Sequence, residues 1–167
     1  MHAMNIVIET TTHADTVRLG RLLAGILKPG MVVALTGDVG AGKTTLVKGI
    51  ASGLLNIDER DVTSPTFTIV QEYRSAGSLF HVDAYRLGNA RELDAVGFDE
   101  CIDGEGVTVI EWADRIEEAL PEETLMIYIE QTGEQQRSFC FKAATPLQEL
   151  VLKSIGEQMR TGADRPD

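Results

Sequence analysis

The chain has 167 residues, with 26 acidic and 15 basic side chains and a formal net charge of −11 at pH 7. This length fits one domain around one hydrophobic core. The negative charge excludes a surface that binds nucleic acid by itself through neutralisation of phosphates. Any role in nucleic-acid chemistry would therefore have to run through a partner.

The composition also bounds location and metal content. No apolar stretch is long enough to cross a bilayer, and Met1–Asn5 lacks the cationic and apolar regions of a signal peptide. We therefore expect a cytoplasmic protein without membrane contact. Cys101 and Cys140 have neither C-x-x-C spacing nor histidines around them, so we expect free thiols, not a metal site or a disulfide.

The first predicted elements are a strand and a helix. Residues 5–9 alternate and are rich in β-branched side chains, which predicts a strand. Thr12, with Asp15 three residues later, resembles a capping box and opens an amphipathic helix. We expect this helix to end at Pro29-Gly30.

A phosphate-binding loop follows, between an apolar strand at 31–36 and a predicted helix at 45–55. Gly37-Asp-Val-Gly-Ala-Gly-Lys-Thr44 matches G-x-x-x-x-G-K-[ST] in full, in the strand–loop–helix context that the mechanism needs. Backbone N–H groups there converge on a di- or triphosphate. Lys43 would reach the phosphates, and the Thr44 hydroxyl would bind Mg²⁺. The residues predicted to bind nucleotide in this segment are Gly37, Asp38, Val39, Gly40, Ala41, Gly42, Lys43, Thr44 and Thr45.

The rest of the chain mixes hairpins with short helices. In chain order we predict a hairpin of 66–73 with 78–83, one or two short helices within 90–101, a central strand at 107–110, a helix at 113–120, a hairpin of 124–130 with 137–141, and a last helix from Pro146 to about Met159. These elements predict a three-layer α/β, P-loop NTPase-like fold whose mixed sheet has a parallel core and antiparallel edge strands. We expect a single domain over residues 1–160 and a disordered tail at 161–167.

Two carboxylates follow apolar strands. Asp83 ends the run 79–82, and Glu111 ends the run 107–110. Ligands of parallel sheets lie at the carboxyl ends of the strands. P-loop enzymes use acidic residues at such positions to hold magnesium through water or to orient the attacking water. The sequence leaves open which carboxylate does which, and also whether either merely ends a strand in solvent.

Ser64-Pro65-Thr66-Phe67 forms a third constellation, in a loop just before the predicted strand. Pro65 holds Ser64 extended and so directs the Thr66 hydroxyl. By analogy with loops that sense a γ-phosphate, Thr66 would touch the magnesium or the terminal phosphate. Ordinary strand-entry chemistry is the alternative that the residues leave open.

Polar side chains also gather around Asp83. His81 and Asp83 share one face of their predicted strand and so have access to the same ligand. Arg86, just beyond the strand, is placed to meet a phosphate or a carboxylate of a partner. The residues leave open the alternative of a hydrogen-bonded cluster that only fixes the exit of the strand. Trp112 follows Glu111 directly and packs near the nucleotide, offers a partner surface, or has a plain packing role.

These motifs, in this order and at these spacings, resemble the bacterial TsaE family, also called YjeE. The resemblance spans about residues 5 to 145, and only the phosphate loop would be ambiguous alone. Residues from Pro146 on carry no motif. The matching segments are Gly37–Thr45, Ser64–Phe67, His81–Leu87 and Val109–Trp112.

The resemblance implies a small ATPase required for the threonylcarbamoyl modification of the adenosine beside the tRNA anticodon. Such a protein binds ATP with Mg²⁺, hydrolyses it slowly, and works with TsaD and TsaB, while TsaC supplies threonylcarbamoyl-adenylate. TsaD performs the transfer, so hydrolysis here would be a conformational switch, and tRNA would be held only indirectly, through the complex. The implied roles are catalysis by Lys43, Asp83 and Glu111, metal binding by Thr44, Thr66 and Glu111, and nucleotide contact by Trp112.

Guanine-specific GTPases and small-molecule kinases use the same loop. A guanine-specific GTPase would need Asn-Lys-x-Asp, which is absent from the sequence. A small-molecule kinase would need an arginine-rich lid, but Arg74, Arg86, Arg91 and Arg115 are scattered. A scaffold without activity is disfavoured because every nucleotide-contacting position is intact.

Overall fold

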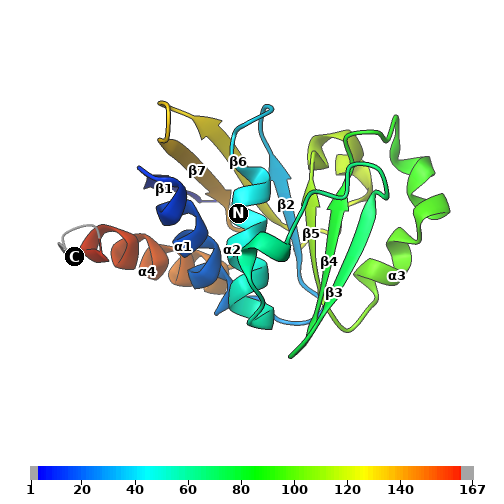
Figure 1. The fold of residues 1–167 in the computed structure, drawn as a ribbon, viewed down its shortest axis with the longest axis horizontal. Coiled ribbons are helices and arrows are strands. Elements are labelled where there is room, and N and C mark those ends of the chain that lie inside the picture. Colours follow the sequence, from blue (N-terminus) through cyan, green and yellow to red (C-terminus); the bar gives the residue numbers. More distant parts are fainter. Residues whose placement is uncertain (1–3, 163–167) are drawn as a thin grey trace.

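The structure is a computed structural model that describes residues 4–162, so residues 163–167 of the predicted tail lie outside the described residues. Within this range seven strands form one sheet in the order β1-β7-β6-β2-β5-β4-β3 (Figure 1). The strands are β1 (Asn5–Thr10), β2 (Val32–Thr36), β3 (Val70–Arg74), β4 (Ser78–Asp83), β5 (Val107–Glu111), β6 (Leu125–Gln131) and β7 (Arg137–Lys142).

The sheet has a parallel centre and antiparallel edges. Strands β6, β2, β5 and β4 pair in parallel. On one side, β7 and β1 continue the sheet in antiparallel pairing, and on the other side β3 does so. The predicted mixed sheet, including both hairpins, is confirmed. The carboxyl ends of β2, β5 and β4 therefore lie side by side.

Helices cover both faces of this sheet (Figure 1). The α-helices are α1 (His13–Ala24), α2 (Lys43–Leu55), α3 (Phe98–Ile102) and α4 (Pro146–Gly162), and the 3₁₀ helices are η1 (Glu59–Asp61), η2 (Ala90–Val96) and η3 (Ala113–Ala119). None of the helices in residues 4–162 is both long and apolar enough to span a membrane.

Two hydrophobic clusters make the three layers. Val33 and Leu35 of β2 belong to the cluster shared with α1, α2 and α4, whereas Val32 and Ala34 belong to the cluster shared with η2, α3 and η3. Because both faces of β2 are buried, its sequence is a continuous apolar run instead of an alternating one. The predicted three-layer α/β architecture is therefore confirmed.

The capping box of α1 is confirmed, but the end of that helix was misplaced. The Thr12 hydroxyl accepts from the Asp15 N–H at 3.0 Å, and the Asp15 carboxylate accepts from the Thr12 N–H at 3.1 Å. The helix ends at Ala24, where Gly25 closes it with its backbone N–H turned back onto the last turn. The prediction that Pro29 ends the helix was wrong, because the hydrogen bonds change to i→i+3 spacing at Gly25 and Ile26, which tightens the last turn before Pro29 is reached.

The first hairpin begins later than predicted. Residues 65–69 form a turn closed by a hydrogen bond of 2.7 Å from the Ile69 N–H to the Pro65 carbonyl, and Ile69 has a φ of 67°. A β-branched residue with positive φ cannot continue a strand. Strand β3 therefore starts at Val70, and Thr66 lies in the turn.

A second sharp turn follows β5. Trp112 has a φ of 58°, which directs the chain out of the sheet immediately after Glu111. The predicted helix at 113–120 is the 3₁₀ helix η3, interrupted at Ile116, whose φ is −135°. Ile116 is fully buried, so its packing overrides regular helix geometry here.

Helix α2, which starts at the phosphate loop, packs against α1 through glycines. A Cβ on Gly20 would lie 2.5 Å from the Leu46 carbonyl oxygen, and a Cβ on Gly49 would overlap the Val17 carbonyl oxygen. The two helices therefore meet at backbone contact. This contact fixes the position of α2 and of the loop that precedes it.

Candidate nucleotide-binding site

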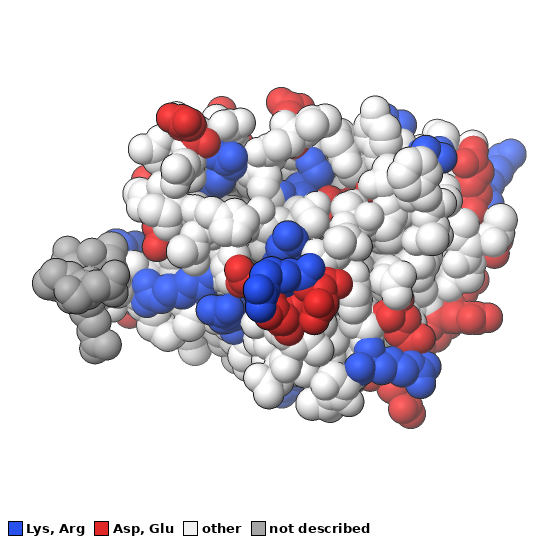
Figure 2. Space-filling view, in the orientation of Figure 1, with Lys and Arg blue, Asp and Glu red and all other residues white. Residues whose placement is uncertain are grey.

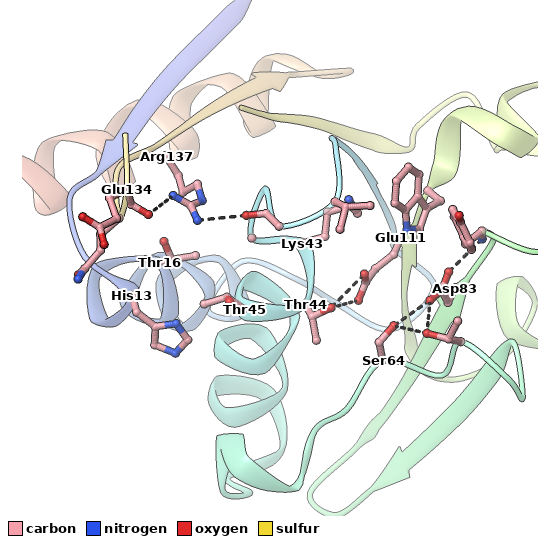
Figure 3. Close-up of a pocket in the computed structure, with 17 residues that line it drawn as sticks. His13, Thr16, Lys43, Thr44, Thr45, Ser64, Asp83, Glu111, Glu134 and Arg137 are labelled. Atoms are coloured by element: carbon pink, nitrogen blue, oxygen red, sulfur yellow. Dashed lines mark hydrogen bonds between the residues drawn. The ribbon is translucent and has the colours of Figure 1, made fainter. Parts of the chain in front are cut away.

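A pocket of about 660 Å³ opens at the carboxyl ends of β2, β4 and β5 (Figure 3). It is lined by the first turn of α1, the loop before α2, the start of α2, the turn at 64–66, the ends of β4 and β5, and the loop between β6 and β7. Ligands of parallel sheets bind at this edge. The topology thus gathers segments that are far apart in the sequence.

The phosphate loop leads directly into α2. Gly42, with a φ of 109°, is the N-cap, and Lys43 is the first helical residue. The Lys43 Nζ donates to the carbonyl oxygens of Gly37 at 2.5 Å and Asp38 at 2.8 Å. It also lies 4.0 Å from the ring centroid of Trp112. The lysine is therefore held at the loop by neutral groups, which leaves its charge available to a phosphate.

The surroundings of Lys43 act on its pKa in opposite directions. Burial lowers the pKa of the Lys43 ammonium below its ordinary value, and nearby carboxylates oppose this shift. A bound polyphosphate would favour the protonated form in the same way. The opposing carboxylates, in order of effect, are Glu111, Asp114, Asp38 and Asp83.

Glu111 is bonded from two sides. The Thr44 hydroxyl donates to its carboxylate, with distances of 2.9 Å to Oε1 and 3.1 Å to Oε2. The Nε2 of His81 lies 2.7 Å from Oε1. Glu111 is 3% exposed, so its carboxylate depends on these bonds. Figure 3 shows Thr44 and Glu111 pointing toward each other.

Asp83 ties the turn at 64–66 to the end of β4. Its Oδ2 accepts from the Ser64 hydroxyl at 2.8 Å and from the Thr66 hydroxyl at 3.1 Å, and its Oδ1 accepts from the Tyr85 N–H at 2.9 Å. Asp83 is also the register partner of Glu111 on the neighbouring strand. The structure thus brings together the two carboxylates that the sequence singled out.

The side-chain atoms available here as metal ligands are hydroxyl and carboxylate oxygens. Thr44, Thr66 and Glu111, together with Asp83, line one pocket, and Mg²⁺ prefers oxygen ligands completed by waters and phosphates. Among residues 4–162, no cluster of three or more His, Cys, Asp or Glu side chains could hold a metal alone. The residues present therefore fit a magnesium ion that shares its ligands with a nucleotide.

Not every predicted nucleotide-binding residue lines the pocket. Val39, Gly40, Gly42 and residues 43–45 do, as does Trp112. Gly37 and Asp38 instead offer their carbonyl groups to Lys43, and Ala41 is buried in the core. Arg86 lies over the ring of Phe67, with 4.5 Å from its guanidinium carbon to the ring centroid, outside the lining.

The sequence analysis missed the residues that line one end of the pocket, around Arg137. Arg137 bridges two segments, because its Nη2 donates to the Gly40 carbonyl at 3.1 Å and its Nη1 to carbonyls of the β6–β7 loop, including Gln136 at 2.9 Å. His13, Thr16, Glu134 and Gln135 line the same end. No local motif marks these residues, since only the pairing of β7 with β1 and β6 brings them beside the loop.

A strand, a glycine-rich loop and a helix that starts with Lys43 and Thr44, beside carboxylates on neighbouring parallel strands, define a P-loop protein. A family model described as "Threonylcarbamoyl adenosine biosynthesis protein TsaE" matches residues 10–139. The chain belongs to the TsaE family of proteins of tRNA threonylcarbamoyladenosine biosynthesis. Membership of this family implies nucleotide binding.

Individual relatives agree over most of their length. The chain is 42% identical over 148 residues to the tRNA threonylcarbamoyladenosine biosynthesis protein TsaE of Bacillus subtilis strain 168, covering 88% of this chain and 91% of that protein. The protein of the same name from Treponema pallidum strain Nichols is 45% identical over 113 residues, covering 68% and 82%. The crystal structure of B. subtilis YdiB superposes with a TM-score of 0.75 at 35% identity, covering 95% of this chain and 98% of that one. The resemblance found in the sequence is thus confirmed.

Proposed function

We propose that this protein is a magnesium-dependent, slow ATPase that acts as a switch, in complex with TsaD and TsaB, in N6-threonylcarbamoyl modification of the adenosine beside the tRNA anticodon. The observation that carries the ATPase proposal is the convergence of Lys43 and Thr44 with Asp83 and Glu111 in one pocket. Family membership supports the pathway. TsaD, and not this chain, would transfer the threonylcarbamoyl group.

In this proposal the loop and its surroundings bind ATP along the pocket. The backbone of residues 37–45 holds the phosphates, and Lys43 exchanges its two carbonyl contacts for phosphate oxygens. Trp112, already against the Lys43 ammonium, stays beside the nucleotide. A nucleoside triphosphate extends beyond the phosphate loop that holds its phosphates. Its ribose and base would therefore lie at the end of the pocket that His13 and Arg137 line.

Thr44, Thr66 and Glu111 would hold the magnesium ion. Bound there, magnesium supplies positive charge that neutralises the phosphate oxygens. The Thr44 hydroxyl is within hydrogen-bond distance of Glu111, so both groups already face one point. Asp83 or Glu111 would orient the attacking water.

The switch in this proposal is the turn at 64–69. Its Thr66 hydroxyl is bonded to Asp83, so a ligand that recruits Thr66 must break this bond. The neighbouring Phe67 is 81% exposed, and Ile69 has a positive φ. A change at the terminal phosphate would therefore reach an exposed aromatic surface that a partner can read.

Charge supports an indirect relation to tRNA. Figure 2 shows basic and acidic side chains side by side on the face that it presents, and the chain has a net charge of −11. A protein with this balance binds RNA weakly on its own. The partners would hold the tRNA, and we propose that this protein acts with them in the cytoplasm.

Lys43→Ala tests the phosphate mechanism. We expect ATP turnover to fall by a factor of about 100 or more, because the ammonium acts on the phosphates, while the circular dichroism spectrum stays unchanged. Lys48→Ala is the matched control, since it removes a lysine from the same helix outside the pocket. Wild-type turnover in Lys43→Ala would refute the mechanism. Faster turnover of GTP than of ATP would favour the GTPase alternative.

Asp83→Asn and Glu111→Gln separate catalysis from binding. Each variant preserves shape and removes a charge, so we expect turnover to fall at least about tenfold with a smaller change in nucleotide affinity. The measurements are steady-state turnover and calorimetric binding of ADP. Equal losses of turnover and affinity would assign the residue to binding instead.

The partner proposal needs its own experiment. The tagged chain is mixed with TsaD and TsaB, with and without ATP and Mg²⁺, and tRNA modification over repeated cycles is measured with the wild type and Lys43→Ala. We expect nucleotide-dependent capture, and sustained modification only with the wild type. Absence of capture in both nucleotide states would contradict the partner proposal and leave the ATPase proposal standing.

A further inference from the structure

The His81 side chain makes one hydrogen bond in the described part of the chain, and its partner is Glu111. We infer that His81 is a positioning residue, which holds the Glu111 carboxylate in place when Thr44 turns to its proposed metal. This inference rests on the proposed function, which gives Thr44 and Glu111 their roles. It assigns to His81 a task that the sequence motif did not specify.

His81 lies beside the Glu111 carboxylate, on the neighbouring strand. His81 lies on β4, where its register partner is Val109 of β5, two residues before Glu111. Its Nε2 is 2.7 Å from the Glu111 Oε1. When Glu111 is ionised, its carboxylate only accepts hydrogen bonds, so this bond then requires a hydrogen on the histidine Nε2. The bond thus fixes both the imidazole and the carboxylate.

The fold alone gives no reason for a histidine at this position. The side chain is 0% exposed, and its Nδ1 has no hydrogen-bond partner among residues 4–162. A buried polar nitrogen without a partner destabilises a protein, so an apolar side chain of similar size would suit the packing better. Leu79, two residues earlier on the same face of β4, is such a side chain. The bond to Glu111 is therefore the feature that a histidine adds.

The need for a second restraint follows from Thr44. Its hydroxyl now bonds to both oxygens of Glu111 and would leave them to serve the metal. The bond from His81 is then the remaining protein hydrogen bond to the Glu111 side chain among those in the described residues.

Lys43 makes this restraint important. Its ammonium interacts electrostatically with Glu111, yet its hydrogen bonds go to the carbonyl oxygens of Gly37 and Asp38. A carboxylate released from His81 could swing to the lysine and neutralise the charge that the phosphate needs. His81 therefore keeps two opposite charges in separate positions within one pocket.

The test compares His81→Leu with His81→Gln. Leucine fills the space without a donor, whereas the glutamine amide N–H reaches toward the carboxylate. We expect His81→Leu to lower kcat about tenfold with a smaller change in KM, and His81→Gln to restore most of the loss. Thr108→Val is the matched control. It removes a buried hydrogen bond, from Thr108 to the Cys101 carbonyl, on the opposite face of the neighbouring strand, so kcat should stay unchanged.

A binding measurement supplies a readout besides turnover. Calorimetry with ADP is done once with Mg²⁺ and once with a chelator. We expect His81→Leu to keep its affinity in chelator and to lose most of the affinity that Mg²⁺ adds in the wild type. In a Glu111→Gln background, His81→Leu should cause little further loss of turnover, because the two residues act through one group.

The outcomes separate this inference from the proposed function. Wild-type kcat and a wild-type magnesium effect in His81→Leu would overturn the positioning role, as would full additivity with Glu111→Gln. If His81→Leu does not fold, His81→Gln is compared with His81→Asn, whose shorter amide cannot reach Glu111, and equal turnover by these two variants would overturn it. A wild-type protein without ATP turnover would refute the proposed function and this inference with it.

Discussion

Helix α2 carries the phosphate loop at its start, and its packing on α1 makes a quantitative prediction for Gly49→Ala. A Cβ at this position would overlap the Val17 carbonyl oxygen and lie 2.9 Å from the Gly20 Cα. Both are backbone atoms, which cannot rotate away. To restore an ordinary carbon–carbon contact of about 3.5–4.0 Å, the helices must separate by about 1 Å.

The magnitude follows from two opposing effects. Over-packing of a close contact costs about 1–3 kcal/mol, and the gap opened along the rest of α1 and α2 adds to this. Alanine gains about 1 kcal/mol over glycine in a helix interior. We therefore expect a net loss of about 1–2 kcal/mol, which lowers Tm by about 2–8 °C in a chain of this size. Nucleotide affinity should fall too, since α2 positions Lys43.

Gly156→Ala is the matched control in α4. A Cβ there would lie 3.7 Å from the Ile8 Cγ1, which is an ordinary contact. The helix-propensity gain of about 1 kcal/mol then stands alone, so we expect Tm to rise by about 2–4 °C. Thermal unfolding followed by circular dichroism at one protein concentration measures both variants. A Gly49→Ala protein at least as stable as the wild type would refute the argument that backbone contact sets this helix pair.

Three further predictions concern the helix-capping residue Asp15, the pocket residue Arg137 and the two cysteine thiols. Burial raises the pKa of the Asp15 carboxyl, but hydrogen bonds from Thr11 and Thr12, which directly precede α1, outweigh this effect and hold the pKa below its ordinary value. Asp15 therefore stabilises the fold above the unfolded-state pKa and loses this effect as pH falls through the folded-state pKa. In urea unfolding, Asp15→Asn should cost about 0.5–1 kcal/mol at pH 7 and less below pH 3.8, and a pH-independent difference would contradict this. Arg137→Lys should weaken ADP binding several-fold, because a lysine cannot bridge the phosphate loop and the β6–β7 loop as the guanidinium does. Calorimetry measures this, and wild-type affinity would show that the bridge is dispensable. Burial raises the pKa of Cys101, so a thiol reagent at neutral pH should modify Cys140 first, and equal rates would contradict the described burial.

The local elements of the fold follow largely from sequence, and the errors have physical causes. The capping box at Thr12 and the glycine loop at 37–44 depend on side chains a few residues apart, so spacing alone predicts them. The end of α1 was misplaced because the helix tightens into i→i+3 hydrogen bonds at Gly25 and Ile26, and no residue pattern marks that change before Pro29. The start of β3 was misplaced because a β-branched Ile69 with positive φ is not a local preference. That conformation is held by the closed turn back to Pro65.

The candidate site was also predicted from the sequence only in part. By itself the sequence determined the phosphate loop, the carboxylates at the ends of two strands and the family, since these depend on residue type and spacing. Only the tertiary structure decided that Asp83 and Glu111 are register partners, that Asp83 binds the turn of Thr66, and that His81 lies beneath Glu111. It also placed Arg137 beside the phosphate loop, although Arg137 is 97 residues from Gly40 in the sequence. Such contacts depend on strand order and register, which the whole core sets and no short segment encodes.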